Sequence, residues 1–338
     1  MAKADFGPKR PEEFEFQDII YEKKDWVARI TLNRPQVYNA YSLNELGEIC
    51  EALHDVIWDG SIAVVVITGA GDKAFCTGGD AKEYATQYPK KPHGFYQWWE
   101  FYDRMLYLIR NCGKPVIARI NGVVAGGGNE INLACDLSIA AEHARFIQPG
   151  TRVGSVSAGG ATQWLPITIG DKRARWLVMV GDEIDAHTAK EWGLVNEVVP
   201  YEQLDEAVDE LCEKLIHKMP DCLRYTKAQC NFWGDLAWTT LAHARDWLTI
   251  HYATAEPLEG FRAFLEKRQA DFMKLRELAA EGKAYEYHWG APIKSCPSCG
   301  TDYLPEEFEF CGKCGARLAP EPGKEKEEEE EKEKEEVK

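Results

Sequence analysis

The chain has 338 residues, a formal net charge of −16 and eleven cysteines. This acidic balance disfavours nucleic acid and anionic membranes as partners, and no apolar run reaches the roughly 18 residues of a membrane span. An odd number of cysteines does not suit a framework of paired disulfides, so we expect a reducing, cytoplasmic location. The length suits one large domain with an appendage.

Strand and helix patterns alternate along the first half of the chain. Residues 26–32 alternate apolar and polar side chains, as a half-buried strand does, and residues 62–67 form a β-branched run that suits a strand buried on both faces. This alternation predicts an α/β fold with mostly parallel connections. The other expected elements are strands at 116–120 and 137–140 and helices at 43–58, 95–111, 129–134, 161–169, 204–218, 222–235, 238–254 and 257–278.

Two glycine-rich segments each stand at an expected strand-to-helix junction. They are residues 76–80 (CTGGD) and residues 125–130 (AGGGNE). Turns without side chains can direct two backbone N–H groups at one point, which is the architecture of an oxyanion hole. The second turn gains further from the positive end of the helix dipole. A plain tight turn is the alternative interpretation of either segment.

The motifs around these turns resemble the crotonase superfamily, also called enoyl-CoA hydratase/isomerase. The resemblance covers residues 14–275 and implies a spiral of ββα repeats over 14–200, with two sheets packed nearly perpendicular. It also implies a C-terminal helical region over 201–280 that builds homotrimers, often paired into hexamers. The motifs are LNRP at 32–35, NAYS at 39–42, AFCTGGD at 74–80, KPVIARING at 114–122, CDL at 135–137 and GLVN at 193–196.

The resemblance assigns roles to the two turns and to one carboxylate. Family members bind acyl-CoA thioesters and stabilise the thioester enolate with two backbone N–H groups, which implies Gly79 and Gly127 as donors. Water-adding members use two Glu residues as acid and base, and Glu130 matches the first of them. Charge compensation at a helix N-terminus is the alternative for Glu130. Gly150 occupies the position of the second Glu, which argues against the usual two-Glu hydratase and the common one-Glu isomerase.

The sequence around Gly150, with a short polar stretch and Gly-Ser after it, resembles that of neighbouring branches of the superfamily. These are 6-oxocyclohex-1-ene-1-carbonyl-CoA hydrolase, which matches best locally, 2-oxocyclohexanecarbonyl-CoA hydrolase and dihydroxynaphthoyl-CoA synthase. The resemblance implies that Glu130 activates a water, which attacks a ring ketone or an activated alkene carbon. Asp80, Ser157 and Thr151 are candidates for polarising the ketone or placing the water. Asp80 is alternatively a helix N-cap, and Ser157 stands where the synthase branch usually carries Asp.

Further residues are predicted around the substrate. Tyr252 matches a C-terminal tyrosine of the synthase branch, where it reaches a neighbouring active site; a buried interface aromatic is the alternative. Arg34 is expected to meet a CoA phosphate or to be exposed to solvent. The aromatic residues 95–102 suit a cyclic or aromatic acyl group, or a helix packed in the core. The other predicted substrate-binding residues are Cys76, Gly78, Lys82, Tyr84, Gly126 and Gly150.

A separate small unit is expected near the C-terminus. Cys296 and Cys299 form one Cys-x-x-Cys pair, and Cys311 and Cys314 form a second pair eleven residues later. Four thiolates at this spacing predict a structural tetrahedral Zn²⁺ site, with iron as the minor alternative, and the unit resembles a zinc ribbon. The predicted organisation is a flexible arm at 1–13, a linker at 281–292, the ribbon at 293–318 and an acidic Glu/Lys tail at 319–338.

These observations lead to three hypotheses for function. The favoured one is an acyl-CoA enzyme that adds water to a cyclic acyl-CoA, with ring-opening hydrolysis of a cyclic oxoacyl-CoA. The second is an enoyl-CoA hydratase/isomerase that acts on an unsaturated acyl-CoA. The third is a non-catalytic acyl-CoA-binding scaffold whose zinc ribbon docks a protein partner. In each case the CoA ester is the small-molecule partner, the metal is structural, and a homotrimer or hexamer is expected.

Overall fold

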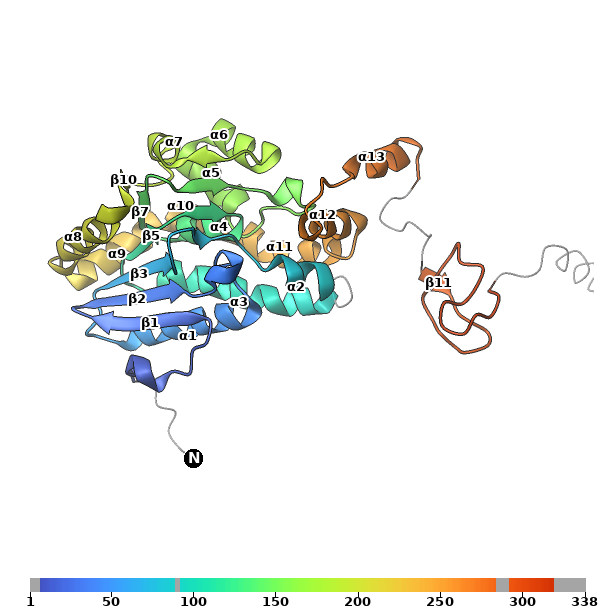
Figure 1. Ribbon diagram of the computed structural model, residues 1–338. Helices are drawn as coiled ribbons and strands as arrows, with labels where there is room; N and C mark the ends of the chain where they lie inside the picture. The colour runs from blue at the N-terminus through green and yellow to red at the C-terminus, as the bar shows by residue number, and fades with distance from the viewer. Residues whose placement is uncertain (1–6, 89–91, 284–291, 319–338) are drawn as a thin grey trace, which may run out of the picture. The chain divides into compact units, whose positions relative to one another are not determined.

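Pairs of strands alternate with helices through the larger of two units, residues 1–271, of the computed structural model (Figure 1). The structure describes residues 7–88, 92–283 and 292–318. Most of the linker predicted at 281–292 and the whole tail predicted at 319–338 lie outside these residues. The second unit comprises residues 272–338.

Two sheets share the strands of the larger unit. The six-stranded sheet has the order β1 (Ile19–Lys24), β2 (Val27–Leu32), β3 (Val64–Gly69), β5 (Val116–Ile120), β7 (Leu137–Ala141) and β10 (Glu197–Val199). The four-stranded sheet has the order β4 (Ala74–Cys76), β6 (Val123–Ala125), β8 (Arg145–Ile147) and β9 (Ile184–Asp185). The pairs β1–β2 and β8–β9 are antiparallel, and the other pairings are parallel. This confirms the predicted α/β, crotonase-like fold.

Each ββα repeat divides its strands between the two sheets. The strands β3, β5 and β7 enter the six-stranded sheet, and the strands that follow them, β4, β6 and β8, enter the four-stranded sheet. The second strands therefore end side by side, and α4 begins directly after β6. The helices of this unit are α1 (Leu43–Trp58), α2 (Ala81–Thr86), α3 (Pro92–Asn111), α4 (Gly127–Ala134), α5 (Ala161–Ile169), α6 (Asp171–Arg175), α7 (Ala186–Trp192), α8 (Leu204–Ile216), α9 (Pro220–Cys230), α10 (Phe232–Leu236), α11 (Trp238–His251) and α12 (Ala255–Leu265).

Strand β3 shows how the sequence builds the core. All six of its residues are buried, as a β-branched run between two layers requires. Because side chains alternate along a strand, Val65 and Ile67 join the main apolar cluster, which includes residues of α1 and α3. Val64 and Val66 instead join a second cluster with Leu204 of α8. Helix α8 therefore belongs to the core of the larger unit, although it lies in the predicted oligomerisation region.

The C-terminal helices are more broken than the sequence pattern predicts. The helix expected at 222–235 is divided into α9 and α10 at Asn231. The helix expected at 257–278 is divided into α12 and α13 (Phe272–Ala280), because Lys267 adopts a left-handed φ of 54° after α12 ends. The Arg268 guanidinium then pairs with Glu259 on α12. No helix among the described residues is long and apolar enough to span a membrane.

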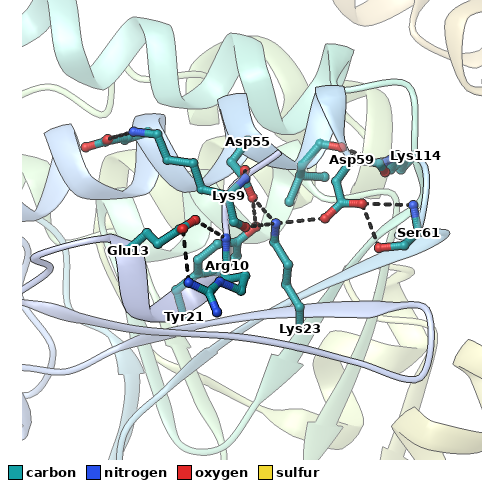
Figure 2. Close-up of polar contacts among 11 residues, drawn as sticks. Lys9, Arg10, Glu13, Tyr21, Lys23, Asp55, Asp59, Ser61 and Lys114 are labelled. Atoms are coloured by element: carbon teal, nitrogen blue, oxygen red, sulfur yellow. Dashed lines mark hydrogen bonds and ion pairs between the residues drawn. The ribbon is translucent and has the colours of Figure 1, made fainter. Parts of the chain in front are cut away.

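A buried polar network joins residues near the N-terminus to β1 and α1 (Figure 2). The Lys23 ammonium contacts Asp55 and lies 2.8 Å from Asp59. The Tyr21 hydroxyl and the Lys9 amide each donate to Asp55 at 2.7 Å, so part of the predicted flexible arm contacts α1. Burial raises the pKa of Asp59, but Lys23 and Ser61 outweigh it and lower that pKa to about 2.

Helix α1 also carries a carboxyl group buried in the core. Glu45 lies in its first turn, is fully buried, and neither of its carboxyl oxygens has a hydrogen-bond partner within residues 7–88, 92–283 and 292–318. Burial raises the pKa of Glu45 to about 9, because the charged form loses its hydration. Native Glu45 therefore keeps a proton at neutral pH that the unfolded chain releases above about pH 4.5, and stability falls as the pH rises between these values.

We expect the substitution Glu45→Gln to stabilise the protein at pH 7 by up to about 3 kcal/mol, because an amide needs no proton to be neutral. Urea denaturation at pH 5, 7 and 8 should show a gain that increases with pH. Glu48 on the same helix is the control, since its carboxylate accepts the amides of Gln17, Asp18 and Ile19. Glu48→Gln should destabilise. An equal stability of Glu45→Gln and wild type at pH 8 would contradict the proposed protonation.

Candidate active site

The two glycine-rich turns lie against each other at the ends of β4 and β6. A Cβ atom on Gly78 would lie 3.1 Å from the Gly127 nitrogen and 3.2 Å from the Ala125 carbonyl oxygen. Gly78 and Gly126 have φ values of 89° and 52°, which favour glycine over residues with a side chain. The Tyr41 amide donates to the Gly78 carbonyl at 2.9 Å, which fixes the first turn to the segment before α1.

Two amides at these turns have no partner within the described part of the chain. Neither the Gly79 N–H nor the Gly127 N–H donates a hydrogen bond there, and both residues are partly exposed. The Gly127 amide also lies at the N-terminus of α4, where the helix dipole is positive. Unpaired, ordered N–H groups of this kind are suited to hold an oxygen atom that gains negative charge.

Tyrosine hydroxyls explain why these two positions are glycine. A Cβ atom on Gly79 would lie 2.0 Å from the Tyr84 hydroxyl, and one on Gly127 would lie 1.8 Å from the Tyr41 hydroxyl. Neither glycine has a positive φ, so the space taken by the hydroxyls, and not the backbone conformation, excludes a larger residue. Burial raises the pKa of both tyrosines well above the usual range, so both hydroxyls stay protonated.

Glu130 lies on the first turn of α4, directly after the second glycine turn. It is 5% exposed, its Oε2 accepts a hydrogen bond from the Tyr102 hydroxyl at 2.5 Å, and its Oε1 accepts the Ala161 amide at 3.4 Å. Burial raises the pKa of Glu130, and the Tyr102 and Ala161 hydrogen bonds partly oppose this. A raised pKa moves the proton exchange of this carboxyl group from the acidic range toward neutral pH, the direction that an acid–base catalyst requires.

The comparison with known families follows this geometry. The model of the enoyl-CoA hydratase/isomerase family matches residues 22–275. The chain belongs to this family.

Solved structures of enoyl-CoA hydratases and an isomerase resemble the chain. An enoyl-CoA hydratase from Mycobacterium avium subsp. paratuberculosis K-10 is 26% identical with a TM-score of 0.69, and the match covers 76% of this chain and 98% of that one. An enoyl-CoA hydratase from Bacillus anthracis is 36% identical with a TM-score of 0.60, over 75% and 98% of the two chains. A monofunctional enoyl-CoA isomerase from M. smegmatis is 30% identical with a TM-score of 0.56, over 65% and 95%.

In this enoyl-CoA hydratase/isomerase family member, no carboxylate stands at position 150. A Cβ atom on Gly150 would lie 3.0 Å from the Ser157 hydroxyl, so the loop packs closely where a second Glu is expected. Ser157 donates to the Gln148 side chain at 3.3 Å. The Thr151 hydroxyl donates to the Met179 carbonyl at 3.2 Å, in a π-helical turn after α6. The Ser157 hydroxyl therefore lies beside Gly150, and the Thr151 hydroxyl is bonded to the backbone of the π-helical turn.

Asp80 and Arg34 pair with each other beside the first turn. One Asp80 oxygen accepts the Lys82 amide at 2.9 Å and caps α2, as the N-cap alternative predicts. The other oxygen accepts the Arg34 guanidinium at 3.0 Å. Arg34 also donates to the Ala40 carbonyl. Both side chains are therefore already engaged by the protein. The catalytic role predicted for Asp80 and the CoA-binding role predicted for Arg34 stay predictions. Cys76 is fully buried under this turn.

Tyr252 packs inside its own chain. Its ring stacks on Phe95, with centroids 4.2 Å apart, and contacts Tyr84 at 5.4 Å. Its hydroxyl lies 3.0 Å from the Ser155 hydroxyl. Helices α11 and α12 pack against α3 and α2 of the same chain and enclose Tyr252 there. The role at a neighbouring active site that the resemblance implies for Tyr252 stays a prediction.

Two tyrosines near Glu130 were not identified as site residues from the sequence. Tyr41 and Tyr102 stack with centroids 5.5 Å apart, and their hydroxyls meet Gly127 and Glu130 respectively. Tyr41 is part of the NAYS motif, and Tyr102 lies in the aromatic segment 95–102. Their spacing from Glu130 carries no signal, because the contact forms only when α3 packs against α4.

The smaller unit brings the four predicted cysteines together. All four Sγ atoms lie within 4.8 Å of one another, with Cys296–Cys314 at 3.6 Å and Cys299–Cys311 at 3.7 Å. Four thiolates bound to one Zn²⁺ at about 2.3 Å would lie about 3.8 Å apart, so the set fits a tetrahedral metal. Strands β11 (Pro292–Lys294) and β12 (Leu304–Pro305) pair beside it.

The described residues 292–318 of this unit form almost no apolar core. Between residues 292 and 318, only Cys296 and Cys311 are buried. The turn after each cysteine pair is closed by a glycine amide, from Gly300 to the Cys296 carbonyl and from Gly315 to the Cys311 carbonyl. Because these residues bury so little apolar surface, a metal held by the four cysteines would supply folding free energy that an apolar core does not.

Proposed function

We propose that this family member adds water to a cyclic acyl-CoA ester, with ring-opening hydrolysis of a cyclic oxoacyl-CoA as the favoured reaction. The observation that supports it is that one of the two Glu residues of the usual hydratase is absent: Glu130 is buried beside the glycine turns, and Gly150 stands in place of the second. The aromatic side chains near Glu130, including Tyr84, Trp98 and Tyr102, suit a cyclic acyl group.

In the proposed reaction, the Gly79 and Gly127 amides hold the thioester oxygen. Glu130 takes a proton from a water molecule as the water oxygen bonds to the ring-ketone carbon. The bond between that carbon and the thioester α-carbon then breaks, and its electron pair forms the thioester enolate. The amides stabilise this enolate, and a proton returns to the α-carbon. The product is an open-chain CoA ester with a new carboxylate, and the net change is the addition of one water.

Hydration or isomerisation of an unsaturated acyl-CoA is the second candidate. It is favoured by the similar structures, which are named as enoyl-CoA hydratases and an enoyl-CoA isomerase. It needs the same amides, because an enolate also forms when water adds to the alkene. Without a carboxylate at position 150, the second proton transfer would fall to Glu130 or to another acid.

The test is mass-resolved chromatography of the protein with 2-oxocyclohexanecarbonyl-CoA, 6-oxocyclohex-1-ene-1-carbonyl-CoA and crotonyl-CoA. We expect 2-oxocyclohexanecarbonyl-CoA to gain one water and 6-oxocyclohex-1-ene-1-carbonyl-CoA to gain two, because its alkene must be hydrated before ring cleavage can leave an enolate. Both should give fragments of an open-chain dicarboxylic CoA ester. Hydration of crotonyl-CoA alone would replace this proposal with the plain hydratase. Tight binding of all three esters without turnover would support a non-catalytic acyl-CoA-binding scaffold.

We also propose that the four cysteines hold a structural Zn²⁺ and that the chain forms a homotrimer or hexamer. Four thiolates leave no open position for chemistry at the metal, and iron is the alternative for the same ligand set. The oligomer is supported by large apolar side chains exposed on the C-terminal helices, which a partner copy would cover. These are Tyr225, Phe232, Trp233, Leu236 and Ile250.

A further inference from the structure

Tyr102 contacts the carboxylate of Glu130 from a neighbouring helix. It lies on α3, is 1% exposed, and its hydroxyl donates a 2.5 Å hydrogen bond to Glu130 Oε2. Its ring stacks on Trp98 and on Tyr41, with centroids 5.3 and 5.5 Å apart. Packing against two rings therefore fixes the hydroxyl at one particular oxygen of the carboxylate.

The two oxygens of Glu130 differ in what surrounds them. Oε2 accepts the short bond from Tyr102, whereas Oε1 accepts the Ala161 amide at 3.4 Å, near the limit of hydrogen bonding. The Gly159 backbone also contacts the carboxylate. A Cβ atom on Gly159 would lie 2.3 Å from Oε2 and 2.4 Å from the Tyr102 ring, so Oε2 is also enclosed sterically. Oε1 is the oxygen with capacity left to accept a proton.

The titratable groups that face Glu130 are tyrosines. They are Tyr102 on α3, Tyr41 before α1, Tyr84 on α2 and Tyr252 after α11, and each has its pKa raised by burial first and also by the nearby Glu130. Among the described residues, no lysine, arginine or histidine pairs with Glu130. The Tyr102 hydroxyl is therefore the main side-chain group that stabilises negative charge on this carboxylate.

We propose that Tyr102 is a positioning residue for Glu130, which holds Oε2 so that Oε1 accepts the proton of the attacking water. This inference rests on the proposed function, in which Glu130 is the base. It also fits a site that lacks the second expected Glu. Because Gly150 has no side chain, the Tyr102 hydroxyl is the polar side-chain group that contacts Glu130.

The test is the substitution Tyr102→Phe, which keeps the ring stacking and removes the donor. Because the hydroxyl favours the ionised carboxylate, its loss should move the acidic limb of the kcat/KM profile up by about one pH unit. The value of kcat/KM should then fall roughly tenfold on the acidic side of that limb, where Glu130 is protonated, and change much less on its alkaline side. KM should change little. Tyr88→Phe is the control, since the Tyr88 hydroxyl contacts Glu83 at 3.4 Å and should leave the profile unchanged.

A second measurement does not depend on turnover. The difference in unfolding free energy between wild type and Glu130→Gln, followed against pH, reports the pKa of Glu130. In the Tyr102→Phe background this dependence should extend about one pH unit higher. The same dependence in both backgrounds, or an unshifted kcat/KM profile, would overturn the inference. If Tyr102→Phe shifts this pH dependence but no ester undergoes ring opening, the proposed function is rejected and the Tyr102–Glu130 pairing stands.

Discussion

The substitution Glu130→Gln is expected to lower kcat for water addition by about 10²- to 10⁴-fold, because an amide cannot take a proton from water. Glutamine has nearly the same shape, so binding of the CoA ester should change little. The raised pKa of Glu130 also predicts an acidic limb in the wild-type rate profile, above the usual range for a carboxyl group. Steady-state kinetics between pH 5 and 9, with binding of a CoA ester measured by calorimetry, provide the check.

Stability separates a catalytic role of Glu130 from a structural one. A carboxyl group whose pKa is raised on folding destabilises the native state increasingly as the pH rises above its unfolded value, so Glu130→Gln should be at least as stable as wild type at pH 8. Glu142→Gln is the matched control, because Glu142 is exposed. Full activity of Glu130→Gln in every water-addition assay would remove Glu130 from the mechanism. Loss of activity with equal loss of stability would indicate a structural residue.

Removal of the metal is expected to unfold residues 292–318 and to leave residues 7–271 folded. Apparent binding free energies of structural zinc are about 10–16 kcal/mol, and within this segment only two cysteine side chains are buried. Metal analysis should find one ion per chain. Hydrogen exchange followed by mass spectrometry, before and after chelation, should show lost protection confined to the peptides of the smaller unit.

A cysteine substitution tests the same site without a chelator. Cys311→Ser should abolish metal binding and reproduce the exchange of the chelated protein. Cys230→Ser is the control, because Cys230 is an exposed free thiol on α9. Unchanged protection of residues 292–318 after chelation would mean that this unit folds without the metal. Absorption in the visible range would identify iron in place of zinc.

Local patterns in the sequence predicted much of the architecture. The β-branched run at 62–67 indicated a strand buried on both faces, and β3 is such a strand, shifted by two residues. The helix expected at 43–58 is α1. A strand was expected before each glycine-rich turn, but β4 and β6 could not be given bounds and β8 was not predicted, since three residues carry no periodicity. The helix breaks after Cys230 and Leu265 were missed for another reason: the apolar pattern continues through both of them.

The sequence by itself determined which groups this protein can use. The order of the glycine-rich motifs identified the family. Glycine at position 150 showed that the second catalytic Glu is absent, and the spacing of four cysteines predicted a set of metal ligands. Each of these features is local, because a turn, a residue identity or a Cys-x-x-Cys pair lies within a few consecutive residues.

Only the tertiary structure decided how these groups meet. Tyr102 lies 28 residues before Glu130, and its hydroxyl reaches Oε2 because α3 packs against α4. Asp80 accepts a hydrogen bond from Arg34, 46 residues away in the sequence. This pairing engages a carboxylate for which the sequence left a role toward substrate open. Such contacts depend on helix packing and strand order, and side-chain spacing along the chain does not encode them. The chemistry of the site was therefore predictable in its parts, and its arrangement was set by the fold.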